Sequence, residues 1–151
     1  CALFEAFGAK VIAFDSDDSV VPVGQKVTLE DGLKTAQVIS IHISYSEKNI
    51  GFLNKNLLSK VRSDAVLINT SRGEILDQSA LMESLIEKRL SGATLDVLCN
   101  EPMPLEDAVR QAISKVGDRL IVTPHIAGFT LESLNKVETY VSQLLLEDFS
   151  K

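Results

Sequence analysis

Residues 65–101 read AVLINTSRGEILDQSALMESLIEKRLSGATLDVLCNE and decide the fold. The stretch begins with a short apolar run, Ala65 to Ile68, of the length expected for a strand. A helix should follow, because Asp77 can cap it and Leu81 and Leu85 lie on one face at i, i+4 spacing. Gly92 to Leu98 restores a strand, so the stretch predicts one strand, helix and strand unit of a parallel sheet.

Polar and charged residues follow both strands of this unit. After the first strand, Asn69-Thr70-Ser71-Arg72-Gly73 supplies hydrogen-bonding side chains, a fixed positive charge and a glycine. Two carboxylates, Asp96 and Glu101, stand at the end of the second strand. Ligands bind at the carboxyl ends of the strands in open parallel sheets, so this edge is the candidate binding site.

The residues before the unit predict another strand and its connections. We expect a helix over residues 1–7 that ends at Gly8, followed by a buried strand over residues 11–15 whose last residue is Asp15. Residues 16–26 are polar, contain Pro22, and predict a surface connection.

Two short helices should flank the next strand. Thr28 can cap a helix that runs to about Thr35, and Asn54 can cap a second helix. Between them, residues 38–43 read VISIHI and predict a buried strand. His42 lies inside this apolar run, which favours a core histidine over a ligand.

The residues after the unit predict two helices around a last strand. Pro102 and Pro104 should force an extended turn before a helix over residues 105–115. A strand over residues 120–123 then ends at a proline. A long helix should run from Thr130 toward Phe149, with an apolar stripe facing the core. The stripe comprises Leu134, Val137, Val141, Leu144 and Leu145.

Composition limits the class of protein. A chain of 151 residues with 45% hydrophobic content is long enough for one domain. The formal net charge of −6 disfavours nucleic acid and anionic membranes as partners, and no apolar run approaches the roughly 20 residues that span a bilayer. The two cysteines, Cys1 and Cys99, form no disulfide framework and lack metal-ligand spacing with either histidine. We therefore expect a reducing, cytoplasmic compartment and no metal site.

Three motifs follow one another along the chain: Asn69-Thr70-Ser71-Arg72-Gly73, then Asp96-Val97 followed by Glu101-Pro102, then Pro124-His125-Ile126-Ala127-Gly128. Together they resemble the signatures of the D-isomer-specific 2-hydroxyacid dehydrogenase family. The resemblance implies an α/β fold with a doubly wound, Rossmann-like parallel sheet that binds NAD. Residues 1–151 would be a partial dinucleotide-binding domain, lacking the first strand, its glycine-rich turn and the substrate-binding domain.

The resemblance also implies a catalytic set of Arg72, Glu101 and His125. The planar guanidinium of Arg72 matches a substrate carboxylate, although taken alone it would be read as a surface arginine. His125 would exchange a proton with the substrate oxygen, because imidazole titrates near neutral pH. Glu101 would stabilise the protonated imidazole; its other reading is a solvated loop acid.

Further residues would bind the cofactor. Asp15 would accept hydrogen bonds from the adenosine ribose hydroxyls, or else be an ordinary loop acid. Asp96 would hold the nicotinamide carboxamide, or else only cap the turn that follows it. The remaining cofactor positions are Asn69, Thr70, Ser71 and Gly128. No lysine or arginine stands in Ser16-Asp17-Asp18, so we expect NAD rather than NADP.

The function implied is hydride transfer between NAD and a small D-2-hydroxy acid or 2-keto acid. The motif forms favour the phosphoglycerate and hydroxypyruvate branches, in a full-length homodimer. The alternative is an NAD-sensing corepressor with the same fold. Because no G-x-G-x-x-G turn precedes Asp15, we expect the strands ending at Asp15 and near Ile68 to flank an empty central place. The isolated chain should then be poorly stable, inactive and unable to bind NAD tightly.

Overall fold

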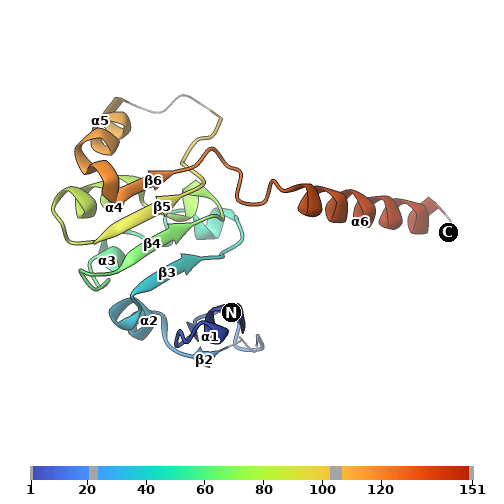
Figure 1. The fold of residues 1–151 in the computed structure, drawn as a ribbon, viewed down its shortest axis with the longest axis horizontal. Helices are drawn as coiled ribbons and strands as arrows, with labels where there is room; N and C mark the ends of the chain where they lie inside the picture. Colours follow the sequence, from blue (N-terminus) through green and yellow to red (C-terminus); the bar gives the residue numbers. More distant parts are fainter. Residues whose placement is uncertain (1, 21–23, 103–106, 150–151) are drawn as a thin grey trace.

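The main body of the computed structural model is a four-stranded sheet (Figure 1), and residues 2–20, 24–102 and 107–149 are described. The helices and strands are α1 (Ala2–Ala6), β1 (Ile12–Ala13), β2 (Gln25–Lys26), α2 (Leu29–Thr35), β3 (Val38–Ile41), α3 (Lys55–Leu58), β4 (Val66–Asn69), α4 (Gln78–Ile86), β5 (Gly92–Leu95), α5 (Asp107–Val116), β6 (Leu120–Val122) and α6 (Leu131–Phe149). Short 3₁₀ turns cover Glu47–Asn49, Gly73–Ile75 and Gly117–Arg119.

The sheet has the order β3-β4-β5-β6, and every pair in it is parallel. Its register places Ile41 beside Asn69, and Asn69 beside Leu95. The segments that follow β4, β5 and β6 therefore leave the sheet at one edge. This arrangement confirms the predicted strand, helix and strand unit and the Rossmann-like parallel sheet with flanking helices.

The hydrophobic core lies between one face of this sheet and four helices. Leu67, Ala93 and Leu95 lie on that face and are almost completely buried. They belong to one buried cluster with residues of α2, α3, α4 and α5, among them Leu33, Leu58, Leu81, Leu85 and Val116. Each fully buried leucine stabilises the fold by about 1.5–3 kcal/mol, so the strands that carry the site loops are firmly held.

The predicted helix starts are confirmed by capping hydrogen bonds. The side-chain oxygens of Thr28, Asn54 and Asp77 accept from the backbone N–H groups of Asp31, Leu57 and Ala80, at 3.1, 3.1 and 2.9 Å. Such caps satisfy backbone donors that have no partner inside the helix.

The first strands form a separate two-stranded parallel sheet, with Ile12 beside Gln25. The strand predicted over residues 11–15 is shorter than expected and only partly buried, because β1 pairs along one edge. The surface connection predicted over residues 16–26 ends in β2, which was missed because Gln25 and Lys26 are polar and exposed. Pro22 lies outside the described residues.

The neighbours of the strand near Ile68 differ from the prediction of an empty place beside it. β3 lies beside β4, so the strand near Ile68 has a neighbour on each side and does not flank an empty place. His42 follows β3 and is exposed, with its Nε2 atom 2.9 Å from the Ser40 hydroxyl. The prediction of a core histidine was wrong, because an apolar run at a sheet edge is covered on fewer sides.

The last helix points away from the sheet (Figure 1). The Thr130 hydroxyl accepts from the Ser133 N–H group at 3.1 Å, as expected for a helix that begins here. The core-facing stripe was wrong, because α6 has no buried residue and Val137, Val141 and Leu145 are exposed.

The helix between β5 and β6 was also predicted. The helix predicted over residues 105–115 is present as α5, while Pro104 and Leu105 lie outside the described residues. Within residues 2–20, 24–102 and 107–149, no helix combines the length and apolar character needed to cross a membrane.

Candidate active site

The loops after β4, β5 and β6 enclose a pocket of about 310 Å³. Its lining includes the three predicted catalytic residues, Arg72, Glu101 and His125, although they come from three separate loops. The other lining residues are Gly73, Glu74, Val97, Leu98 and Pro102. The pocket therefore joins a guanidinium, a carboxylate and an imidazole in one cavity.

His125 and Glu101 form a direct pair. The Nδ1 atom of His125 lies 2.7 Å from the Oε2 atom of Glu101. The other carboxylate oxygen of Glu101 accepts from the Leu98 N–H group at 2.7 Å, which fixes the orientation of the carboxylate. The imidazole side chain is 51% exposed and that of Glu101 is 34% exposed. Because Nδ1 faces Glu101, Nε2 is the nitrogen left to meet a ligand.

The backbone at His125 has an unusual conformation. Its φ angle is +55°, in the left-handed region that residues with a Cβ atom rarely occupy. The N–H group of His125 donates to the carbonyl oxygens of Asp96 at 2.9 Å and Thr123 at 3.0 Å. Such conformations persist where the surrounding structure enforces them, and here two backbone acceptors do so.

Asp96 holds the loop that carries His125. The residue is 3% exposed, and its carboxylate accepts from the Thr123 hydroxyl, from the Ile126 N–H group at 3.0 Å and from the Ala127 N–H group at 2.8 Å. Burial tends to raise the pKa of Asp96, but these hydrogen bonds outweigh it and leave the pKa below its ordinary value. Asp96 thus holds the loop after β6 and does not cap the turn that follows it, which was the alternative that the sequence left open.

Asn69 organises the loop that carries Arg72. Its side chain is fully buried; Oδ1 accepts from the N–H and hydroxyl groups of Ser71, and Nδ2 donates to the Arg72 carbonyl at 3.0 Å. These contacts hold the loop from inside rather than facing a ligand. Thr70 and Arg72 are exposed, and one guanidinium nitrogen donates to the Ser71 carbonyl at 2.6 Å.

Gly73 allows the loop after β4 to lie against the segment after β5. A Cβ atom at this position would lie 2.1 Å from the Leu98 carbonyl carbon and 2.4 Å from the Cys99 nitrogen. The sequence indicated only a glycine in a polar loop. The close approach could not be predicted, because Leu98 is remote in the sequence.

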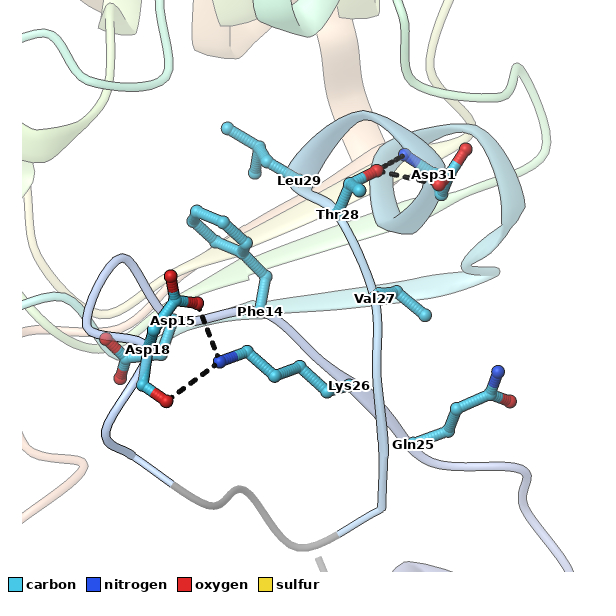
Figure 2. A pocket seen from close by; sticks show the side chains of 9 residues that line it. All are labelled: Phe14, Asp15, Asp18, Gln25, Lys26, Val27, Thr28, Leu29 and Asp31. Carbon is cyan, nitrogen blue, oxygen red and sulfur yellow. Dashed lines mark hydrogen bonds and ion pairs between the residues drawn. The ribbon is translucent and has the colours of Figure 1, made fainter.

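A second pocket, of about 560 Å³, lies beside Asp15 (Figure 2). Oδ1 of Asp15 accepts from the Asp17 N–H group at 2.9 Å, and Oδ2 accepts no hydrogen bond from any described residue. Lys26 also lines this pocket, although the expectation of NAD rested on finding no lysine next to Asp15. Lys26 reaches this pocket because it belongs to β2, which pairs with β1. The residues next to Asp15 in the sequence did not indicate this pairing.

Gly128 lies in the loop after β6 and is exposed. A Cβ atom there would meet nothing within 4 Å, so its neighbourhood is open space. The position has room for a ligand, and its contact with the cofactor remains a prediction.

Residues 1–127 match the profile described as the D-isomer specific 2-hydroxyacid dehydrogenase, NAD binding domain. The chain belongs to this family. It is 32% identical to the hydroxypyruvate reductase of Thermotoga maritima, over 87% of the chain and 42% of the relative. It is 33% identical to the D-3-phosphoglycerate dehydrogenase of Bacillus subtilis, over 94% of the chain and 27% of that relative. The chain thus spans less than half the length of these relatives.

Solved structures show the same fold. The D-lactate dehydrogenase of Aquifex aeolicus, complexed with NAD and lactic acid, is 28% identical with a TM-score of 0.84, over 99% of this chain and 49% of that one. An acyclic imino acid reductase, Bsp5, in complex with NADPH and D-Arg, is 30% identical with a TM-score of 0.78, over 94% of this chain and 46% of that one. Both nicotinamide cofactors therefore occur among structural relatives of this NAD-binding domain.

Proposed function

We propose that the full-length protein transfers a hydride between NAD and a D-2-hydroxy acid or its 2-keto acid. The observation that carries this proposal is the 2.7 Å contact between His125 and Glu101 in a pocket that Arg72 also lines. Bound NADH would supply the hydride for reduction of the keto acid, and bound NAD+ would accept it on oxidation of the hydroxy acid. The protein must then hold the acid and exchange one proton with the reacting oxygen.

Each residue of the pocket has a role in this reaction. Arg72 binds the substrate carboxylate through two N–H groups, because its fork matches the spacing of two carboxylate oxygens. His125 gives a proton from Nε2 to the carbonyl oxygen during reduction and takes it back during oxidation. Glu101 accepts a hydrogen bond from Nδ1 and keeps Nε2 directed at the substrate.

Residues of the Asp15 pocket and of the loops after β4 and β6 would hold the cofactor. Asp15 fits the ribose hydroxyls because one of its oxygens is left without a hydrogen bond among the described residues. We assign further cofactor contacts to Thr70, Ser71 and Gly128, which follow β4 and β6. We also assign Asp96 to the nicotinamide carboxamide; because this residue is 3% exposed and its carboxylate already accepts three hydrogen bonds from the loop after β6, its main contribution is to position His125.

Among substrates, we propose hydroxypyruvate or phosphohydroxypyruvate. The similarity to a hydroxypyruvate reductase and a D-3-phosphoglycerate dehydrogenase, each above 30% identity, supports this choice. We further propose a cytoplasmic homodimer for the full-length protein, as the family resemblance and the cysteine content led us to expect.

Turnover by the full-length protein tests the proposal. Hydroxypyruvate, phosphohydroxypyruvate, glyoxylate and pyruvate would each be offered with NADH. His125→Gln should slow turnover roughly a hundredfold or more, because proton transfer is lost, while NADH affinity stays unchanged. His42→Gln is the matched control, since that histidine is exposed and does not line the pocket.

Two results would contradict the assignment. If His125→Gln kept normal turnover with chemistry limiting the rate, His125 would not be the proton donor. If the unaltered protein bound NADH but reduced none of the four acids, the NAD-sensing corepressor would become the better hypothesis.

A further inference from the structure

The pocket beside Asp15 holds one cation among several carboxylates. Within the described residues, Lys26 is the only basic side chain in its lining, against Asp15, Asp18 and Asp31. β2 pairs Lys26 with Ala13, two residues before Asp15. The strand pairing therefore brings the lysine to the carboxylate that we assign to the ribose.

Asp18 holds this lysine. The Nζ atom of Lys26 lies 3.0 Å from the Asp18 carboxylate and 3.4 Å from the Asp18 carbonyl oxygen, as the dashed lines in Figure 2 show. Two acceptors on one residue thus direct the ammonium group. Lys26 forms neither a hydrogen bond nor an ion pair with Asp15.

The nearby carboxylates have other partners. Asp31 accepts from the Thr28 hydroxyl at 2.7 Å, at the start of α2. Asp17 accepts from the N–H and hydroxyl groups of Ser19, at 2.8 and 2.6 Å, and does not line the pocket. Asp18 is therefore the carboxylate that decides whether the charge of Lys26 is available to a ligand.

That charge matters for one chemical difference between cofactors. NADP carries a phosphate where NAD has a ribose 2′-hydroxyl, and binding the phosphate requires a cation near the ribose acid. Lysine binds phosphate as a point charge, so a free Lys26 would suit this group. A structural relative holds NADPH, so the fold itself does not exclude the larger cofactor.

We propose that Asp18 is a cofactor-specificity residue that discriminates against NADP by keeping Lys26 in an ion pair. The inference deepens the proposed function and rests on Asp15 binding the ribose. The Lys26 side chain is 39% exposed and that of Asp18 is fully exposed, so the pair contributes little to folding stability. Its removal should change ligand binding while leaving the fold intact.

Calorimetric titration of the full-length protein with NAD and with NADP tests this role. Asp18→Asn should raise NADP affinity roughly fivefold to tenfold, because it frees one positive charge and removes one negative charge. NAD affinity should change less than about twofold, since no phosphate is present at its 2′ position. Lys26→Met in the Asp18→Asn background should remove the gain.

Asp17→Asn is the matched control, because it makes the same charge change in the same loop outside the pocket. An equal gain in NADP affinity from Asp17→Asn would show a general charge effect and overturn the proposal. Retention of the gain in the Lys26→Met double variant would also overturn it. Failure of the unaltered full-length protein to bind NAD would instead contradict the proposed function on which the inference rests.

Discussion

Asp96 and Asp15 each follow a parallel strand, yet the structure uses them differently. Asp96 follows β5, is almost fully buried and accepts three hydrogen bonds from the loop after β6. Asp15 follows β1, is partly exposed and accepts one hydrogen bond from its own turn. The same pattern, an apolar run that ends in an acid, therefore gives one carboxylate whose hydrogen bonds hold a loop in place and one that is available to a ligand.

The neighbours of each strand explain the difference. β5 lies between β4 and β6, so the loops on both sides can cover Asp96. A buried carboxylate must be given hydrogen bonds, and the 123–127 loop supplies them. β1 has two residues and pairs with one strand, β2, so few residues surround the Asp15 carboxylate.

The largest expected effect concerns the contact between Gly73 and the segment that begins with Asp96. Gly73→Ala should lower the free energy of unfolding by about 3 kcal/mol or more, because its Cβ atom would overlap the Leu98 backbone, which cannot rotate away. Chemical denaturation of the full-length protein measures this loss. Gly128→Ala is the control and should change stability by less than about 0.5 kcal/mol, since its Cβ atom would meet open space. Equal stability of the two variants would show that the loop contact is loose.

A smaller effect is expected from Asp96→Asn. The amide nitrogen would face an N–H donor in either orientation, which should cost about 2 kcal/mol of unfolding free energy at pH 7. The pKa of Asp96 is lowered in the folded state, so its stabilisation is present above the unfolded pKa of about 3.9 and is lost as the pH falls through the lower folded value. The gap between the variant and the unaltered protein should therefore narrow below about pH 4 in denaturation curves. A gap that is constant down to pH 2 would contradict this explanation.

The smallest effect is expected at Asp15. Asp15→Ala should change the free energy of unfolding by no more than about 0.5 kcal/mol, because the carboxylate accepts one local hydrogen bond. NAD affinity of the full-length protein should fall by about tenfold or less, and NADP affinity by less, so the preference narrows. Calorimetry measures both. A loss of stability as large as that of Asp96→Asn would remove the contrast between the two acids.

The features that sequence predicts well are local. Asn54 and Asp77 cap helices through donors three residues away, and the apolar run before Asn69 defines a strand without reference to the rest of the chain. The predicted catalytic residues share one pocket because parallel strands bring their carboxyl ends to one edge.

The features that sequence did not predict depend on distant residues. The donors to Asp96 come from the loop after β6, and the steric need for Gly73 comes from Leu98. Lys26 reaches the Asp15 pocket through a strand of two polar residues that has no periodic pattern. The apolar stripe of α6 follows helical spacing, but spacing alone does not show whether anything packs on it.

The segment after β5 contacts and supports all three parts of the site. Glu101 is attached to it through the Leu98 N–H group, and His125 through the Asp96 carbonyl. The loop of Arg72 rests on it at Gly73. A displacement of this one segment should therefore shift Glu101 and His125 together, so that the 2.7 Å contact on which proton transfer depends is kept, and should also move the support of the Arg72 loop.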